Sequence, residues 1–199
     1  MALRETLQLG DPRLKSPNKP VENFNDPVIK QVIEDLTESM RAGGLIGMAA
    51  PQTGENYMVF VTEPRETKFR PAAQADELRV YINPIMVEVS LEEVIIYEGC
   101  GCVANVQDFG PVIFGPVKRP KEITIEAYDQ NGRKFRLRCN GILARVIQHE
   151  YDHLWGIEFV EKIFDYGRLV SLPFYVANIK NSQEQVEASL VTIKEYQSF

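Results

Sequence analysis

The stretch that most constrains this chain is Gln148-His149-Glu150-Tyr151-Asp152-His153-Leu154, which contains both of its histidines. Because the two histidines are four residues apart, a helix places their rings on one face, with Cβ atoms about 5–6 Å apart. Two such rings can hold one metal ion, and in the H-E-x-x-H pattern the intervening carboxylate takes a proton from the attacking water. The stretch therefore predicts a helical metal site with His149 and His153 as ligands and Glu150 as the base.

Two histidines at helical spacing can also be solvated side chains on an exposed face. The preceding residues favour a buried helix, because apolar side chains recur at positions 142, 143, 146 and 147. Buried rings and a buried carboxylate need something that compensates their desolvation, and a cation does so. We expect Asn140 to be the N-cap of this helix and Gly156 its C-terminal stop.

Length and composition narrow the class of protein. A chain of 199 residues with 25% charged side chains is typical of one compact globular domain. Its net charge of -6 is not the positive charge that is typical of nucleic-acid-binding proteins, so nucleic acid is not expected as the direct substrate. We find neither a signal peptide nor a segment of membrane-spanning length. Three cysteines are too few for a disulfide framework, so we expect a cytoplasmic protein.

Hydrophobic periodicity predicts a mixture of helices and strands. An amphipathic helix covers residues 27–41. Residues 122–129 and 134–139 alternate apolar and polar side chains around Asn131-Gly132, which predicts a hairpin with a type I′ turn. We also expect strands at 57–61, 78–82, 86–89, 93–97 and 157–163, a surface loop at 63–77, a bent connection at 105–120, an irregular segment at 165–175 and a terminal helix at 181–196.

Two other stretches carry candidate chemical groups. Gln52 follows small residues at 47, 49 and 50, and its amide can hydrogen-bond a developing oxyanion, although tight packing alone also explains the small residues. Cys100 lies beside glycine at an expected strand end, where a thiolate can bind a metal that already has two histidine ligands. A buried structural thiol is the alternative. We interpret Cys102 as a neighbour of the metal site and not as a ligand.

Together, three motifs resemble those of the peptide deformylase family. They are Leu45-Ile46-Gly47-Met48-Ala49-Ala50-Pro51-Gln52, Glu98-Gly99-Cys100-Gly101-Cys102 and Gln148–Leu154, in the family's order. The resemblance extends from about residue 5 to about residue 164. It implies an α+β fold in which small antiparallel sheets pack around a central metal-binding helix. Residues 1–164 would form the catalytic domain, and residues 165–199 a C-terminal extension with a helix, packed on the same domain.

The resemblance also implies an activity. The protein would be a metal-dependent hydrolase that removes the N-formyl group from N-formylmethionyl peptides of nascent proteins and releases formate, with transient ribosome contact. Cys100, His149 and His153 would hold one divalent ion, Fe²⁺ in the cell, with Zn²⁺ or Ni²⁺ as substitutes. Glu150 would be the general base. Gln52 and the N–H of Gly101 would stabilise the oxyanion, and an apolar pocket for methionine would contain Ile46, Gly47, Ile96 and Val146.

Several residues depart from the family's pattern. Leu45 replaces the first glycine of the early motif, and Gly101-Cys102 replaces the usual Leu-Ser after the metal cysteine. These changes affect the expected substrate range and leave the ligands, the base and the glutamine intact. Arg145, one turn before His149, is expected to pair with a nearby acid such as Glu98, and a position bordering the substrate cleft is the alternative.

Two other functions fit parts of the sequence. A zincin-type metallopeptidase shares H-E-x-x-H but needs a third ligand downstream, and without a third histidine only Glu158, Glu161 or Glu184 could serve. Replacement of Cys100 would then leave the metal bound. A catalytically altered paralogue, with its pocket closed by Leu45, would bind metal without hydrolysing a substrate.

Overall fold

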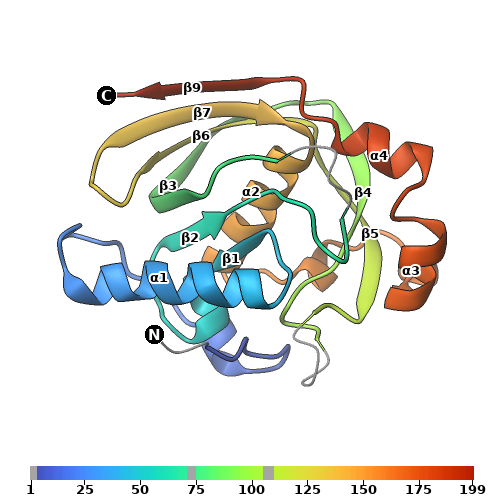
Figure 1. Cartoon of the computed structure of the whole chain (residues 1–199), viewed down its shortest axis with the longest axis horizontal. Helices are drawn as coiled ribbons and strands as arrows, with labels where there is room; N and C mark the ends of the chain where they lie inside the picture. Colours follow the sequence, from blue (N-terminus) through green and yellow to red (C-terminus); the bar gives the residue numbers. More distant parts are fainter. Residues whose placement is uncertain (1–3, 71–74, 105–109) are drawn as a thin grey trace.

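Two antiparallel sheets pack around one buried helix, α2, which spans Gly141–Leu154 (Figure 1). The computed structural model describes residues 4–70, 75–104 and 110–199. Within these residues the smaller sheet has three strands, in the order β4 (Glu93–Glu98), β5 (Ile113–Pro120) and β8 (Val170–Ser171). The larger sheet has six strands there, in the order β1 (Gly47–Ala49), β2 (Val59–Thr62), β3 (Arg79–Val89), β6 (Glu122–Tyr128), β7 (Lys134–Asn140) and β9 (Lys194–Ser198). This arrangement confirms the expected α+β fold class.

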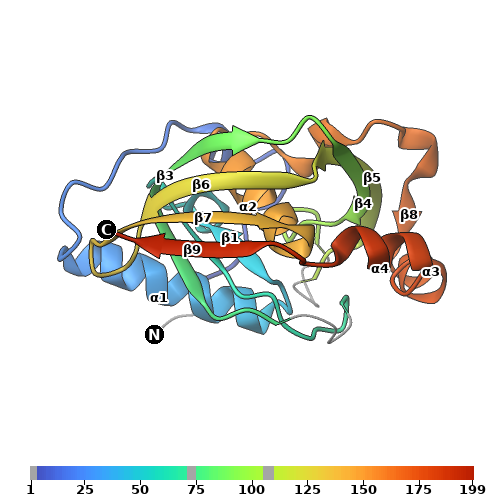
Figure 2. The same ribbon diagram turned by 90° about the horizontal axis from the view of Figure 1, so that it is seen from above.

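Helix α2 lies beneath the larger sheet, whose strands β3, β6, β7 and β9 pass over it in Figure 2. Its side chains Leu143 and Ile147 belong to one buried cluster with Ile125 and Leu137 of the sheet. Helix α1 (Pro27–Ala42) packs against β1 and β2, with Leu36 completely buried. The helix that carries both histidines is therefore held by packing along its length, which fixes where its rings point.

The ends of the two long helices follow from local sequence. Helix α1 begins at Pro27, and the carboxylate of the preceding Asp26 accepts a hydrogen bond of 2.9 Å from the N–H of Val28. Helix α2 ends just before Gly156, which has a φ of 68°, a left-handed conformation that favours glycine. The helix expected at 27–41 and the glycine stop of the histidine helix are both confirmed.

The C-terminal segment is bound to the rest of the fold by hydrogen bonds. The side-chain oxygen of Asn140 accepts from the N–H groups of Thr192 and Ile193, at 2.8 and 3.0 Å, and does not cap α2. Asn140 occupies the N-cap position of α2, as predicted, but its side chain makes no capping hydrogen bond because the C-terminal segment takes the amide. Helix α4 (Gln183–Ser189) covers only the first half of the helix expected at 181–196. The chain then continues as β9, because the open edge of β7 offers backbone hydrogen bonds to an extended segment.

The hairpin of β6 and β7 is confirmed, but its turn is not type I′. The paired residues Tyr128 and Lys134 are separated by residues 129–133, too many for a two-residue turn. The N–H of Gly132 donates to the C=O of Asp129 at 3.0 Å, and Gly132 has a φ of 75°. Asn131 does not share the positive φ that a type I′ turn requires. A type I turn followed by a left-handed glycine closes this hairpin.

Other local predictions were wrong in part. Residues 78–82 and 86–89 form the single strand β3, which stays continuous across two register shifts. The connection expected at 105–120 contains the strand β5, in which Pro116 lies opposite Tyr97 of β4. Residues 105–109 and 71–74 lie outside the described residues, and the rest of the 63–77 loop is irregular as expected.

Two segments after α2 also differ from their predictions. The strand expected at 157–163 contains the 3₁₀ turn η3 (Phe159–Lys162) instead. The segment 165–175, expected to be irregular, contains η4 (Tyr166–Arg168), the short strand β8 and the beginning of α3 (Leu172–Asn178). These short elements are stabilised by contacts with β5, which is distant in sequence.

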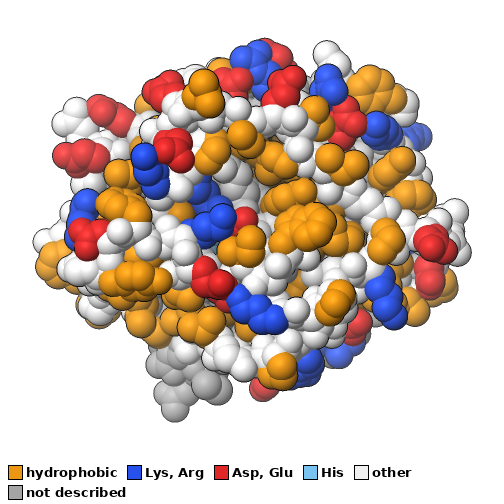
Figure 3. Space-filling view, turned by 180° about the vertical axis from the view of Figure 1, so that it is seen from behind, with side chains coloured by type: hydrophobic (Ala, Val, Ile, Leu, Met, Phe, Trp, Pro, Cys, Tyr) orange, Lys and Arg blue, Asp and Glu red, His pale blue; other side chains and the backbone are white. Residues whose placement is uncertain are grey.

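No helix in the described part of the chain combines the length and the apolar character that crossing a membrane would require. The face drawn in Figure 3 shows Lys and Arg interspersed with Asp and Glu among apolar side chains. Mixed charges of this kind produce little net field over that face.

Candidate metal centre and active site

The three sequence motifs meet around the sulfur of Cys100. Cys100 follows β4, the two histidines come from α2, and Gln52 lies in the 3₁₀ turn η2 (Ala50–Thr53). The Cys100 sulfur lies 3.3 Å from Nε2 of His153. Burial lowers the pKa of His149, but hydrogen bonds with Cys100 and Glu98 outweigh burial and raise that pKa to about 10. The His149 ring lies beside the His153 ring, with centroids 5.1 Å apart, so both rings are close to the same sulfur.

Glu98 fixes the orientation of the first histidine. Its carboxylate, 6% exposed, accepts a hydrogen bond of 2.9 Å at Oε2 from Nδ1 of His149, which leaves Nε2 of that ring free to face Cys100. Oε1 also accepts from Arg119 and Arg145, both at 2.8 Å. Burial raises the pKa of Glu98, but the two arginines hold it well below its ordinary value. Arg145 therefore pairs with Glu98, as the sequence led us to expect.

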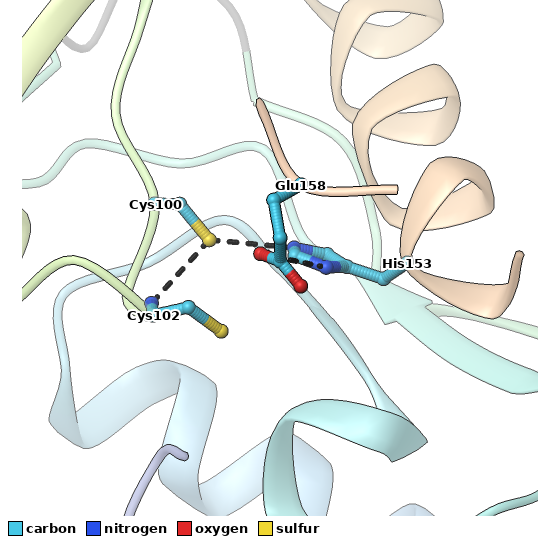
Figure 4. Close-up of side chains that lie close together, drawn as sticks. All are labelled: Cys100, Cys102, His153 and Glu158. Carbon is cyan, nitrogen blue, oxygen red and sulfur yellow. Dashed lines mark hydrogen bonds and ion pairs between the residues drawn. The ribbon is translucent and has the colours of Figure 1, made fainter. Parts of the chain in front are cut away.

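Glu158 occupies the equivalent position behind the second histidine (Figure 4). Its carboxylate is 1% exposed, and Oε2 lies 3.6 Å from Nδ1 of His153, slightly beyond hydrogen-bond distance. Both carboxylate oxygens and that ring nitrogen are buried, and none of them has a hydrogen-bond partner among the described residues. Burial lowers the pKa of His153, but Cys100 and Glu158 outweigh it and raise that pKa well above its ordinary value. The sequence offered Glu158 only as a ligand of the zincin alternative.

The sulfur of Cys102 lies among the candidate metal-binding atoms, whereas the sequence led us to expect only a neighbour of the metal site. Its sulfur belongs to a group of donors, with Cys100, His153 and Glu158, that all lie within 4.8 Å of one another. Hydrogen bonding to Cys102 and burial raise the pKa of the Cys100 thiol to about 12. Nε2 of Gln52 donates to both sulfurs, at 3.6 Å for Cys100 and 3.5 Å for Cys102. Gln52 is thus held directly beside the sulfur that the two rings face.

Glu150 is buried with one free carboxylate oxygen. The side chain is 3% exposed, and burial raises the pKa of the carboxyl. Within the part of the chain that the structure describes, Oε2 has no hydrogen-bond partner. Gly47 allows this carboxylate to approach β1, because a Cβ at position 47 would lie 2.5 Å from Oε1 of Glu150 and 2.5 Å from Val146. The glycine in the early motif therefore makes room for Glu150.

Two departures from the family's pattern compensate each other. A Cβ at position 101 would lie 2.9 Å from the terminal carbon of Leu45, closer than van der Waals contact. The space that a side chain would take after the metal cysteine is therefore filled by Leu45 from the opposite wall. This pairing was not foreseen, because the two residues are far apart in sequence.

A cavity of about 80 Å³ opens onto these groups. Of the residues expected to form a methionine pocket, Ile46, Gly47 and Val146 line it, whereas Ile96 is buried and does not. The catalytic candidates Gln52, Cys100, Gly101, His149 and Glu150 also line it, and so does Arg145. Sequence reasoning missed Arg70, Phe69, Phe114 and Tyr175 in the lining, because none belongs to a motif.

The donor set fits a divalent metal. One sulfur and two imidazole nitrogens with carboxylates behind both rings are the ligands and partners that such ions use in proteins. Buried polar atoms without partners are rare in native structures, and here they cluster at His153, Glu150 and Glu158. A cation would compensate their desolvation. The arrangement, with a buried carboxylate beside a cavity, defines a metal-dependent hydrolase.

Comparison with known proteins identifies the family. The sequence model of the family described as Polypeptide deformylase matches residues 3–168. The peptide deformylase of Dictyoglomus thermophilum is 37% identical over 160 residues, 80% of this chain and 92% of the relative. That of Neisseria meningitidis is 39% identical over 163 residues, 82% of this chain and 88% of the relative. This chain belongs to the polypeptide deformylase family.

Solved structures agree with this assignment. The crystal structure of peptide deformylase from Thermotoga maritima is 30% identical with a TM-score of 0.69, covering 83% of this chain and 100% of that one. A Met-Ala-Ser-bound class I type b peptide deformylase from Acinetobacter baumannii is 28% identical with a TM-score of 0.74, covering 81% and 99%. The protein is accordingly a metal-dependent hydrolase that removes N-formyl groups from nascent peptides.

Proposed function

We propose that Cys100, His149 and His153 hold the divalent metal ion of this deformylase, with Fe²⁺ in the cell and Zn²⁺ or Ni²⁺ as substitutes. The observation that carries this assignment is that the Cys100 sulfur lies 3.3 Å from Nε2 of His153, whose ring lies beside that of His149 with centroids 5.1 Å apart, and that Cys100 and His149 line the cavity. When bound, the metal would supply a Lewis acid that polarises the formyl carbonyl and makes water more acidic. The substrate would be an N-formylmethionyl peptide, with Ile46, Gly47 and Val146 beside the methionine side chain.

Glu150 would move the proton in this reaction. Its free Oε2 is available to accept a proton from the attacking water, and the carboxyl would then donate that proton to the leaving amine. Burial raises the pKa of Glu150, which makes the carboxylate a better base and the carboxylic acid able to persist until the amine leaves. General acid–base catalysis of this kind is commonly worth about 10²- to 10⁴-fold in rate.

Gln52 and Gly101 would stabilise the oxyanion. The carbonyl of the Gln52 side chain accepts from the N–H of Ala49 at 2.7 Å, which fixes the amide so that Nε2 points toward the two sulfurs and the cavity. The N–H of Gly101 has no acceptor among the described residues and lies in the cavity lining. A preoriented donor of this type contributes roughly 3 kcal/mol to transition-state stabilisation.

The contacts support this assignment over a zincin-type site. The Glu158 carboxylate lies at Nδ1 of His153, whereas Cys100 lies at Nε2, so Glu158 orients the ring from behind. A zincin would instead need a carboxylate on the side where both Nε2 atoms point. The cavity lining also contains Leu45 together with the catalytic candidates, which favours an open active site over a closed, catalytically altered paralogue.

The test combines metal analysis with an assay of formate release. Protein prepared anaerobically should contain about one divalent ion per chain, and the Fe²⁺ or Ni²⁺ form should release formate from formyl-Met-Ala-Ser. Cys100→Ala should lose the metal, whereas the matched control Cys139→Ala, a buried cysteine of β7, should keep it. Glu150→Gln should keep the metal and lose activity by about 10²-fold or more, unlike the exposed control Glu184→Gln. Metal retention by Cys100→Ala would contradict the ligand assignment.

We further propose that residues 1–164 form the catalytic domain and that residues 165–199 are an extension packed on it. In support, the family match ends at residue 168, and Gln185 of α4 exchanges two hydrogen bonds with the backbone of Tyr97 on β4. Action on nascent chains would place the protein in the cytoplasm, in transient contact with the ribosome. Cosedimentation with ribosomes that carry formylated nascent chains would test that contact, and its absence at low salt would contradict it.

A further inference from the structure

One wall of the catalytic cavity comes from segments outside the three motifs. Arg70, from the loop after β2, and Tyr175, on α3, both line the cavity. Tyr175 is 2% exposed, and its ring stacks on Phe114 with centroids 3.8 Å apart and an interplanar angle of 2°. Phe69 belongs to the same buried cluster. Because Tyr175 lies beyond residue 168, where the family match ends, this chain's own C-terminal segment forms part of the cavity.

Arg70 is a positively charged residue of this wall, and no acidic side chain of the described residues forms an ion pair with it. Within the described ranges its guanidinium forms no hydrogen bond and no ion pair. The neighbouring arginines are already engaged, since Nη1 of Arg145 donates to Glu98 and to the C=O of Val117, and Arg119 donates to both oxygens of Glu98. Glu98 also accepts from the first histidine. Glu98, the acid whose charge acts on Arg70, therefore has both of its oxygens hydrogen-bonded to other groups.

The position of Arg70 leaves its charge poorly compensated. The side chain is half-buried, and burial lowers its pKa, an effect that Tyr175 and Glu98 offset only in part. A guanidinium is nevertheless always protonated in proteins. A half-buried guanidinium in a cavity that Phe114 and Tyr175 also line has lost part of its hydration, which is costly unless an anion replaces the lost water. A carboxylate is the matching anion, because it can accept two parallel N–H···O bonds from the planar guanidinium.

We propose that Arg70 and the Tyr175 wall form an anion subsite in the catalytic cavity, which binds a carboxylate of the formylated peptide. Arg70 would then be a specificity residue that favours substrates with aspartate or glutamate close to the formylated methionine. The inference rests on the proposed deformylase function and deepens it by naming a substrate class. It leaves the metal ligands and Glu150 in the roles given above.

Released formate is a second source of a carboxylate for the same subsite. The two sources differ in what Arg70 controls. Peptide recognition appears as a preference between an acidic peptide and its amide, whereas formate retention appears as product inhibition. Both are measured on the metal-loaded enzyme with the full chain.

The experiment uses pairs of peptides with amidated C-termini, so that only the side chain differs in charge. The pairs are formyl-Met-Asp-Ser with formyl-Met-Asn-Ser, and formyl-Met-Ala-Asp with formyl-Met-Ala-Asn. For the wild type, at least one acidic peptide should have a kcat/KM on the order of 10-fold higher than its amide, the usual scale of one charge-assisted hydrogen bond. Arg70→Gln should abolish that ratio, and Arg70→Lys should restore only part of it.

Lys68→Gln is the matched control, because it removes one positive charge from the same loop at an exposed position. It should leave the acidic preference unchanged. Affinities of the unformylated Met-Asp-Ser and Met-Asn-Ser amides, measured by calorimetry, should follow the same pattern. Arg70 makes no side-chain bond among the described residues that folding would lose, so Arg70→Gln should keep the metal content and the thermal unfolding midpoint of the wild type.

Three outcomes overturn the inference. One is equal kcat/KM for acidic and amide peptides in the wild type, and another is an acidic preference that survives Arg70→Gln. The third is a change confined to formate inhibition, which would mean that the subsite retains product and does not select substrate. Failure of the wild type on C-terminally amidated formyl-Met-Ala-Ser, which carries no charge, would instead contradict the proposed function, so the two failures are distinguishable.

Discussion

Gly47 offers a sharp test of how Glu150 is positioned. A Cβ at position 47 would lie 2.5 Å from Oε1 of Glu150, whereas ordinary van der Waals contact begins at 3.4 Å. In Gly47→Ala the carboxylate must therefore retreat by about 0.9 Å, the difference between those distances. A displacement of about 1 Å at a reacting group can cost on the order of 10²-fold in rate. We expect kcat/KM for formyl-Met-Ala-Ser to fall about 10²-fold, or roughly 2.7 kcal/mol.

The variant should still fold and bind metal, although crowding against Val146 should lower its thermal unfolding midpoint. The backbone at Gly47 does not have a positive φ, so alanine is compatible with it, and none of the proposed ligands is changed. Metal content and the thermal unfolding midpoint of Gly47→Ala check this expectation. The assay is continuous detection of formate over a range of peptide concentrations, so that kcat and KM are separated.

A double mutant shows whether the loss acts through Glu150. If Gly47→Ala displaces the base, then adding it to Glu150→Gln should cost little beyond Glu150→Gln alone. Retention of more than a third of the wild-type kcat/KM in Gly47→Ala would refute the argument. Multiplicative losses in the double mutant would also refute it, because the two residues would then act independently.

Three further predictions follow from other contacts. Glu158→Leu should weaken metal binding about 10- to 100-fold, because His153 loses the carboxylate behind it. The measurement is the rate at which a chelator removes the metal, and a rate equal to that of the control Glu184→Gln would contradict this role. Gly101→Leu should lower activity on its own and recover it in combination with Leu45→Gly, since the two side chains compete for one space; additive losses in the double mutant would exclude the pairing. Arg119 and Arg145 lower the pKa of Glu98, so its contribution to stability should be complete above about pH 4.5 and be lost as the pH falls toward the lower folded-state pKa. In Glu98→Gln the free energy of unfolding should therefore fall less steeply with decreasing pH than in the wild type. An equal slope in the two proteins would contradict this.

The groups that carry the chemistry were predictable because each is fixed by local sequence. The spacing of His149 and His153 on one helix determines their common face, whatever surrounds the helix. Cys100 and Gln52 were recognisable because each lies in a short motif whose order along the chain resembles a known family. The structure places all of these residues in one cavity lining or in direct contact with it.

The residues that support this site were not predictable, because their partners are distant in sequence. Glu158 follows a helix end and has no motif, so its position behind His153 depends on how η3 packs. Tyr175 and Arg70 reach the cavity from two segments without periodicity. The edge strand β9 was mistaken for helix because positions 186, 190 and 193 are apolar at helical spacing. Pairing with β7, which local sequence does not encode, decides its conformation.

The most direct test of the metal centre is X-ray absorption spectroscopy of the zinc-loaded protein. The nearest shell should contain one sulfur at about 2.3 Å and nitrogen or oxygen neighbours near 2.0–2.1 Å, of which two are imidazole. Cys139→Ala should give the same spectrum, and Cys100→Ala should give no sulfur shell. A first shell without sulfur, or a sulfur contribution that persists in Cys100→Ala, would contradict the assignment of Cys100, His149 and His153 as the ligands.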